Sequence, residues 1–294
     1  MRERRLEAAE RLYRLAVQYG APAEMKVGDA LLAQGRIEEA WPFYEHRRVR
    51  ERLIRSRLSM PEWLGEDLTG KNLFVWYEQG FGDQIWAARF LPLLNAAKVT
   101  YFGTAPLERL FRVLGVDYRV VDGEVDVSGF DCWVTAMSLP YRLGLTPAAM
   151  PRPPYLTASA RPSSGRVGVM FEGNPENPNQ PFRSIPGDLR AALLGVPGAI
   201  DLSPAATGAR DFMDTAEIIA GLDLVISVDT AVAHLAAALG APCWVLLSRE
   251  RLDWFWPEEG PSTWYPEART FHQPTPGDWH SVIDAVLQEL AAAR

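Results

Sequence analysis

The chain of 294 residues has only two cysteines, Cys132 and Cys243, which are 111 positions apart, and only four histidines, which are scattered singly. Neither a framework of disulfide bonds nor a zinc site of the usual close ligand spacing can be drawn from residues so few and so scattered. The sequence therefore predicts a protein of the cytoplasm that holds no structural metal and no disulfide bond.

The chain also lacks an excess of positive charge and a long apolar run. Its 30 basic side chains are outnumbered by 37 acidic ones, so no overall field attracts the phosphate backbone of a nucleic acid. The longest apolar stretch, residues 231–247, is interrupted by His234, Gly240 and Pro242 and is too short to span a membrane. The first residues alternate in charge and do not form a secretory signal. We therefore expect no nucleic-acid partner, no transmembrane segment and no secretion.

What the chain has is an average globular composition, with 48% hydrophobic and 23% charged residues, and a length that suits two domains. Residues 2–19 and 27–55 carry apolar side chains at helical spacing, the second stretch being interrupted at Gly35. The segment around Gly35 resembles the turn and second helix of a tetratricopeptide repeat. Because one repeat cannot bury its own faces, we expect residues 1–60 to form a helical cap that takes no part in the active site.

From residue 72 onward, short apolar runs alternate with stretches of helical spacing, which is typical of a parallel sheet covered by helices. A Pro-, Ser- and Gly-rich stretch interrupts this alternation, and we place a domain boundary near residue 160. Residues 214–217 have the spacing of a capping box and predict a helix over 215–221. The sequence thus predicts a two-lobed α/β protein whose ligand site is the crevice between the lobes.

The first candidate loop, residues 78–83, follows a predicted strand and precedes a helix predicted over 85–97. Its Gly80 and Gly82 allow a tight turn and leave backbone amides free for a polar ligand. Asp83 can act on that ligand or simply stabilise the start of the helix. The three-glycine fingerprint of dinucleotide-binding proteins is missing, which disfavours an oxidoreductase.

The second candidate loop, residues 172–186, is long for a connection between a strand and a helix, and long loops at this edge of a sheet often bind ligands. Arg183 is its only cation. A guanidinium can hold two phosphate oxygens, although a solvated surface arginine is an equal interpretation from the sequence.

The third candidate loop joins an apolar strand to a helix within residues 224–234. Asp229 and Thr230 stand at the predicted start of that helix, where free amides and the helix dipole favour a phosphate, and both are also ordinary capping residues. His234 lies one turn into the apolar helix, where a buried histidine with satisfied ring nitrogens is the default expectation.

Taken in order, the three loops resemble those of glycosyltransferase family 9, which contains the bacterial heptosyltransferases, and most closely its members fused to tetratricopeptide repeats. The resemblance runs from about Trp63 to the C-terminus. Its motifs here are Glu-Gln-Gly-Phe-Gly-Asp-Gln (78–84), Glu-Gly-Asn-Pro (172–175), Arg-Ser-Ile-Pro (183–186), Asp-Thr-Ala (214–216), Ser-Val-Asp-Thr-Ala-Val-Ala-His-Leu-Ala (227–236) and Pro-Gly-Asp-Trp (276–279).

The resemblance implies the GT-B architecture: an α/β fold of two Rossmann-like lobes, here with a short all-helical N-terminal extension. The acceptor lobe would be residues 61–160 and the nucleotide-sugar donor lobe residues 161–294. The implied activity is an inverting, metal-independent transfer of a hexosyl or heptosyl group from a nucleotide-diphosphate sugar to a hydroxyl of a glycan, a lipid-linked acceptor or a protein. The nucleotide-sugar is a substrate, and no cofactor is implied.

The resemblance also implies roles for single residues. Asp83 matches the family's acidic residue, the base for the acceptor hydroxyl. The acceptor-side loop would include Glu78, Gln79, Gly80 and Gly82, and the donor would be bound by Asn174, Arg183, Ser227, Asp229, Thr230 and His234. Gln180 stands where related proteins commonly carry Asp, and Ala231 where heptosyltransferases carry Gly. The alternative interpretation is therefore a non-catalytic binding or scaffold protein that keeps the fold and a vestigial nucleotide pocket.

Overall fold

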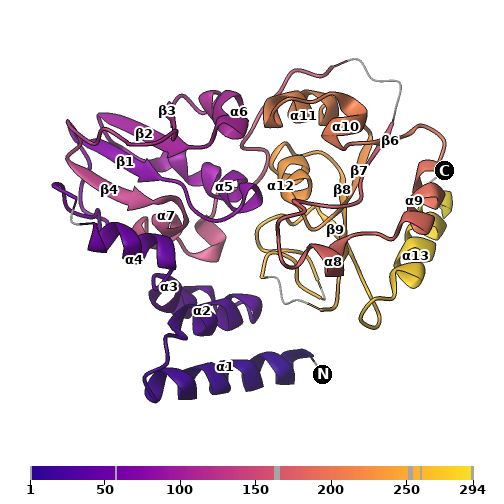
Figure 1. Cartoon of the computed structure of the whole chain (residues 1–294), viewed down its shortest axis with the longest axis horizontal. Coiled ribbons are helices and arrows are strands. Elements are labelled where there is room, and N and C mark those ends of the chain that lie inside the picture. The colour runs from indigo at the N-terminus through magenta and orange to yellow at the C-terminus, as the bar shows by residue number, and fades with distance from the viewer. Residues whose placement is uncertain (1, 57, 162–165, 251–253, 259, 293–294) are drawn as a thin grey trace.

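A computed structural model describes residues 2–56, 58–161, 166–250, 254–258 and 260–292. Two α/β lobes lie side by side, and a helical extension lies beneath the first of them (Figure 1). Among the described residues, no helix combines the length and the apolar character that crossing a membrane requires.

The helical extension consists of α1 (Arg2–Gln18), α2 (Glu24–Ala33), α3 (Ile37–Tyr44) and α4 (Arg48–Arg55). The predicted break at Gly35 is confirmed, since this glycine has a φ of +75° in the turn between α2 and α3. The chain breaks a second time between α3 and α4, which the apolar spacing did not predict. At that break Arg47 turns its guanidinium inward toward the first lobe.

The first lobe is built on a parallel sheet with the strand order β3-β2-β1-β4. Its strands are β1 (Asn72–Trp76), β2 (Lys98–Gly103), β3 (Asp117–Val120) and β4 (Cys132–Thr135), and its helices are α5 (Phe81–Ala87), α6 (Glu108–Arg112) and α7 (Leu139–Arg142). Short 3-10 turns cover Ala88–Leu93, Ala105–Leu107, Ala136–Ser138 and Pro147–Ala149. The helix predicted over 85–97 is wrong at both ends, because α5 starts at Phe81 and tightens into a 3-10 turn at Ala88.

The second lobe is also built on a parallel sheet, with the strand order β6-β5-β7-β8-β9. Its strands are β5 (Val167–Met170), β6 (Ala199–Asp201), β7 (Leu224–Val228), β8 (Cys243–Leu247) and β9 (Arg269–His272). Its helices are α8 (Gln180–Arg183), α9 (Gly187–Leu194), α10 (Pro204–Thr207), α11 (Phe212–Ile219), α12 (Ala231–Ala238) and α13 (Trp279–Ala292). Two parallel sheets covered by helices confirm the predicted α/β fold class. The domain boundary near residue 160 stays a prediction.

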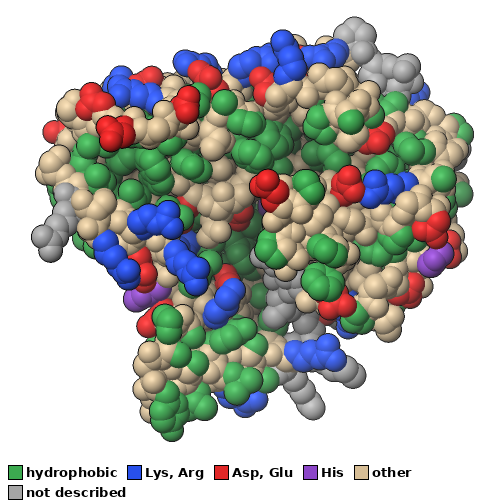
Figure 2. Space-filling view, viewed as in Figure 1, with side chains coloured by type: hydrophobic (Ala, Val, Ile, Leu, Met, Phe, Trp, Pro, Cys, Tyr) green, Lys and Arg blue, Asp and Glu red, His purple; other side chains and the backbone are tan. Residues whose placement is uncertain are grey.

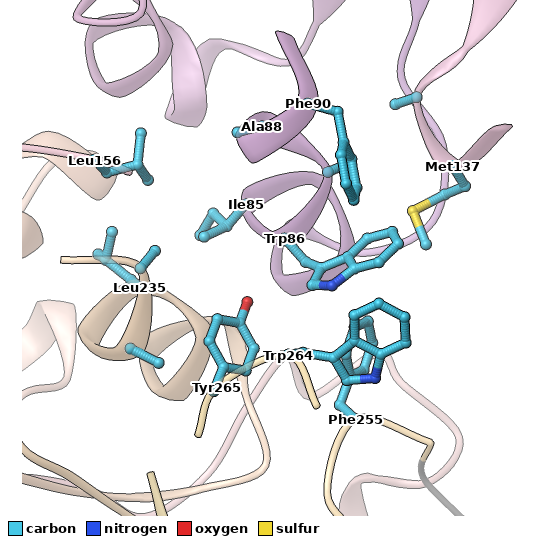
Figure 3. Packing of buried hydrophobic residues seen from close by; sticks show 14 of the residues in the cluster. Ile85, Trp86, Ala88, Phe90, Met137, Leu156, Leu235, Phe255, Trp264 and Tyr265 are labelled. Carbon is cyan, nitrogen blue, oxygen red and sulfur yellow. The ribbon is translucent and has the colours of Figure 1, made fainter. Parts of the chain in front are cut away.

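An aromatic cluster joins the two lobes. Trp86 of α5 meets Trp254, Phe255 and Trp264 of the second lobe edge to face, with ring centroids 5.3, 5.6 and 5.2 Å apart. Figure 3 shows Trp86 and Phe90 on one side of this contact and Trp264 and Phe255 on the other. Each large apolar side chain stabilises a fold by roughly 1.5–3 kcal/mol when fully buried, so the cluster fixes α5 against the second lobe.

Ion pairs join the lobes a second time, between α6 and α11. Arg109 of α6 reaches Asp211 at 2.9 Å and Asp214 at 2.8 Å, and basic side chains gather over these helices along the upper edge of Figure 2. Hydrogen bonds from Arg210 and Arg109 hold the pKa of Asp214 well below its usual range. The capping box predicted at 214–217 is wrong, because Asp211 caps the helix by accepting the Asp214 amide at 2.8 Å. The Asp214 carboxylate instead forms ion pairs with Arg109 and Arg210.

Candidate functional site

A cavity of about 1160 Å³ lies where the two lobes and the helical extension meet. In Figure 2 the surface is hollowed between the extension and the lobes above it. All three candidate loops of the sequence border this cavity. The loops that follow β5 and β7 come together because these two strands are neighbours in the sheet, and parallel neighbours end at the same edge.

The first candidate loop brings Gln79, Gly80, Gly82 and Asp83 to the cavity wall. Gln79 has a φ of +63°, a left-handed conformation that costs a residue with a side chain roughly 1–2 kcal/mol. The amide of Gly80 donates to Oδ2 of Asp83 at 3.0 Å, so the carboxylate caps α5 while it borders the cavity. Both roles that the sequence left open for Asp83 are therefore compatible with its position.

Glu78 does not border the cavity. Its carboxylate is fully buried behind the loop and pairs with the Arg47 guanidinium, Oε1 lying 2.7 Å from Nε and Oε2 lying 3.1 Å from Nη2. The same guanidinium donates to Ser138 Oγ at 2.6 Å. Glu78 thus anchors the first candidate loop to the helical extension, and its side chain is not part of the cavity wall.

In the second lobe, Arg183 lies at the end of α8 beside the start of α12. Its Nη1 donates to the carbonyl oxygen of Asp229 at 3.0 Å, and its Nε lies 3.4 Å from Oε1 of Gln180. A side chain at Gly173 would come within 3.1 Å of Thr230 and 3.2 Å of Arg183, so the three residues form one continuous wall. The structure therefore brings the only cation of the second loop to the helix start of the third.

Thr230 caps α12, with Oγ1 accepting the amide of Val232 at 3.3 Å. Ser227 is fully buried behind it, donates to the Val228 carbonyl at 2.7 Å and lies 3.1 Å from the Thr230 hydroxyl. Ser227 does not border the cavity and acts by holding Thr230. Asp229 does border it, and its Oδ1 accepts the indole N–H of Trp256 at 2.9 Å.

Asn174 also lies on the cavity wall, where its Oδ1 accepts the amide of Glu176 at 3.0 Å. This side chain therefore shapes the turn of the second loop, as asparagine commonly does by bonding to the backbone two residues on.

His234 is buried where α12 packs against α5. Burial lowers the pKa of its imidazole to about 4, so the ring is neutral at neutral pH. Its Nδ1 lies 3.1 Å from the hydroxyl of Tyr265, and its Nε2 lies 3.9 Å from Oδ1 of Asp229. A Cβ at Gly82 would come within 2.6 Å of the ring, so this position has to be glycine for α5 to approach α12.

The sequence reasoning missed the part of the site that the helical extension contributes. Tyr13 of α1 and Met25, Lys26 and Asp29 of α2 line the cavity, so the expectation that the extension takes no part in the site is wrong. Helical spacing shows which residues share a face but not what that face meets after folding. A second part of the wall that was missed comes from residues 254–265, which are rich in aromatic residues. That richness could have indicated a role in the site, since Trp254 and Phe255 line the cavity.

Within the part of the chain that the structure describes, no three His, Cys, Asp or Glu side chains are grouped as ligands for a metal ion.

The model of glycosyltransferase family 9 (heptosyltransferase) matches residues 206–247, which run from α10 to β8 and include the start of α12. Protein FlbA of Caulobacter vibrioides is 26% identical over 328 aligned positions, which cover 90% of this chain and 54% of FlbA. The chain therefore spans about half the length of the curated relative it matches.

The fold is shared with solved structures of other proteins. The Escherichia coli heptosyltransferase WaaC with ADP-2-deoxy-2-fluoro heptose has a TM-score of 0.51 and 12% identity, covering 76% of this chain and 100% of WaaC. A glycosyl transferase family 9 protein of Veillonella parvula has a TM-score of 0.50 and 12% identity, covering 76% of this chain and 91% of that one. The two-lobed α/β architecture is thus that of the heptosyltransferases. The further likeness to members fused to tetratricopeptide repeats stays a prediction.

Proposed function

We propose that the protein is an inverting glycosyltransferase that moves a sugar from a nucleotide-diphosphate donor to a hydroxyl group of an acceptor. The observation that carries this proposal is that one cavity is bordered by Asp83 from the first lobe and by Arg183 with the start of α12 from the second. The family match over residues 206–247 and the heptosyltransferase-like fold support the same conclusion. Because the WaaC structure holds an ADP-sugar analogue, an ADP-sugar is the first donor to test.

In the proposed reaction the donor diphosphate lies at the start of α12, where the free amides and the helix dipole favour negative charge. The acceptor oxygen attacks the anomeric carbon from the side opposite the diphosphate, and Asp83 accepts the hydroxyl proton. As the new glycosidic bond forms, the bond to the diphosphate breaks and its electron pair stays on the leaving phosphate oxygen. Arg183 and the α12 amides stabilise that developing charge, and the single displacement inverts the anomeric centre.

The acceptor is proposed to lie against the helical extension. Tyr13 and Met25 give this part of the wall an apolar character, and Lys26 and Asp29, which pair at 3.1 Å, give it polar groups. A glycan, a lipid-linked saccharide or a protein side chain each presents a hydroxyl with further apolar and polar groups around it. The extension would therefore select the acceptor, whereas the second lobe would select the donor.

Replacing Arg183 with Ala should weaken the binding of a nucleoside diphosphate by about 1.5–3 kcal/mol, or roughly 10- to 150-fold in Kd, which is the usual contribution of a hydrogen bond to a charged group. Calorimetric titration with ADP and with other nucleoside diphosphates measures this. Arg269→Ala is the matched control, since Arg269 of the same lobe pairs with Glu289, neither residue lines the cavity, and Kd should stay unchanged. An Arg183→Ala protein with parental affinity would remove this residue from the donor site.

Turnover should not depend on a divalent metal, because Arg183 and the α12 amides already face the position proposed for the leaving diphosphate. We expect the same rate in a chelator such as EDTA as in buffer with magnesium. Loss of activity in the chelator with recovery on addition of Mg²⁺ or Mn²⁺ would show that the charge is stabilised in another way.

The scaffold alternative is favoured by one observation. Gln180 is buried beside Arg183, where its neutral amide donates to Ser184 at 2.8 Å and presents its oxygen to the guanidinium. A non-catalytic protein of this kind would bind a nucleoside diphosphate and be stabilised by it in a thermal-shift assay. It would show no turnover with any donor and acceptor pair, which separates it from the enzyme.

A further inference from the structure

Arg89 is a buried cation for which the proposed reaction has no use. It lies in the 3-10 turn Ala88–Leu93 after α5, and only 2% of its surface is exposed. Its guanidinium donates to three backbone carbonyls, among them Trp264 at 3.0 Å, and to the hydroxyl of Tyr155 at 3.2 Å. Among the described residues it forms no ion pair with a carboxylate. Because burying a cation without a counter-charge is costly, its position calls for an explanation.

A chain of hydrogen bonds leads from Arg89 to His234. The hydroxyl of Tyr155 lies 3.2 Å from that of Tyr265, and the hydroxyl of Tyr265 lies 3.1 Å from Nδ1 of His234. The guanidinium also stacks on the rings of Tyr155 and Tyr265, with its central carbon 4.5 and 4.9 Å from the two ring centroids. This series of hydrogen bonds thus runs from the first lobe, through the segment between the two sheets, to α12 of the second lobe. Figure 3 shows Tyr265 beside α12, near Leu235.

The direction in which these hydrogen bonds are donated follows from Arg89, where the series begins. A guanidinium has no acceptor, so the Tyr155 oxygen accepts from Arg89. The Tyr155 proton is then donated to Tyr265, and the Tyr265 proton is donated to Nδ1 of His234. In the reverse direction the Tyr265 proton would point toward the cation, and the partly buried Tyr155 would have to donate its proton to solvent. The charge of Arg89 therefore orients both hydroxyl groups toward His234.

If Nδ1 of a neutral imidazole accepts a hydrogen bond, the ring proton is on Nε2. The lowered pKa of His234 supports the neutral form. The Nε2 edge of the ring faces Gly82 and Asp229, but the Asp229 oxygen at 3.9 Å is beyond hydrogen-bond distance. His234 also lies on the cavity wall.

We propose that Arg89, Tyr155 and Tyr265 are positioning residues that hold His234 in its Nε2–H tautomer and so present a neutral hydrogen-bond donor to the cavity between Gly82 and Asp229. The donor suits an oxygen of a bound nucleotide-diphosphate sugar. The proposal that His234 donates to the nucleotide-sugar rests on the proposed function. The proposal for its tautomer rests on the series of hydrogen bonds from Arg89.

Long-range ¹H–¹⁵N NMR of the ¹⁵N-labelled full chain without ligand tests the tautomer, because it identifies which ring nitrogen carries the proton. His234→Asn assigns the signal. We expect Nε2 to be protonated and Nδ1 to have the shift of a hydrogen-bonded acceptor. Tyr265→Phe should move the Nδ1 signal of His234 to that of a nitrogen without a donor. His272, whose Nε2 lies 3.0 Å from the Pro257 carbonyl oxygen, is the internal control and should not change.

Two further variants test the direction in which the hydrogen bonds between Arg89 and His234 are donated. Tyr155→Phe keeps the packing of the ring but separates Tyr265 from Arg89, and Arg89→Met removes the charge. Each should give His234 a mixture of tautomers in place of one. A protonated Nδ1 in the parent chain, or a His234 signal that Tyr265→Phe leaves unchanged, would overturn the proposal.

Titration with ADP or an ADP-sugar separates this inference from the proposed function. If a ligand oxygen accepts from His234, the Nε2 signal should shift on binding and Tyr265→Phe should reduce that shift. A parent chain that has the expected tautomer but does not respond to any nucleotide would contradict the proposed function and leave the tautomer standing. A protein that binds the nucleotide but carries the His234 ring proton on Nδ1 would contradict the proposed tautomer and leave the proposed function standing.

Discussion

Replacing Asp83 with Asn should lower turnover by roughly a hundredfold or more while leaving donor affinity unchanged, because an amide cannot accept the proton of the acceptor hydroxyl. The helix cap should survive the substitution. The Asn oxygen can still accept the Gly80 amide that Oδ2 of Asp83 accepts at 3.0 Å, and Asn caps a helix as well as Asp does. A turnover assay at saturating donor, combined with calorimetric titration of the donor, measures both quantities.

Asp278→Asn is the matched control for this experiment. Asp278 also stands at a helix start, where its Oδ1 accepts the amide of Ser281 at 3.0 Å, but it lies away from the cavity. The same chemical change there should leave turnover within about twofold, since Asn replaces Asp at a cap with little loss. If Asp83→Asn stays within a few fold of the parent, the base is another residue. If the parent binds no donor, the scaffold alternative is the better interpretation.

The strands of both sheets could be predicted largely because parallel strands are buried on both faces and so read as nearly continuous apolar runs. Residues 72–77 and 243–247 are of this kind, and both are strands in the structure within one residue at either end. The edge strand β9 was missed, because Arg269–His272 has a charged residue at its start and no buried side chain. This strand lies at the edge of its sheet with all four side chains at least partly exposed, so the apolar signal is weak.

The first residues of the helices were less predictable, because the start of a helix depends on which carboxylate accepts its first backbone amides. At α5, the apolar spacing begins at Ile85, but the backbone is already helical from Phe81 through the Gly80 and Asp83 cap. At α11, the sequence offers Asp211 and Asp214 three residues apart. Asp211 became the cap because Asp214 is held by arginines, and one of these, Arg109, comes from the other lobe. Such a choice is made by tertiary contacts and cannot be read from spacing.

The part of the cavity wall that comes from the second lobe could be predicted, since the loops after β5 and β7 meet through a general rule of parallel sheets. The part that comes from the helical extension could not. Tyr13 and Lys26 reach the cavity because the extension docks on the first lobe. A buried ion pair between Arg47 and Glu78, which are 31 positions apart in the sequence, contributes to that docking.

Breaking this pair should destabilise the protein strongly. Arg47 and Glu78 are each 1% exposed, so Arg47→Met leaves a buried carboxylate without its counter-charge. Losing one partner of a buried pair costs about 3–5 kcal/mol, which lowers the melting temperature of a chain of this size by roughly 6–20 °C. Arg55→Met is the control. Arg55 pairs with Glu51 on the exposed side of α4, where an ion pair contributes at most about 1 kcal/mol.

A double variant, Arg47→Met with Glu78→Met, distinguishes a lost charge balance from lost packing. Because apolar side chains of similar volume can replace a buried ion pair with little net change, the double variant should regain most of the melting temperature that Arg47→Met loses. Both variants should bind a nucleoside diphosphate like the parent at a temperature where they are folded, since neither position borders the cavity. Turnover should fall in both, because Glu78 anchors the loop that carries Asp83. An Arg47→Met protein that melts within about 2 °C of the parent, a shift of no more than roughly 1 kcal/mol, would show that the extension is held in place by other contacts.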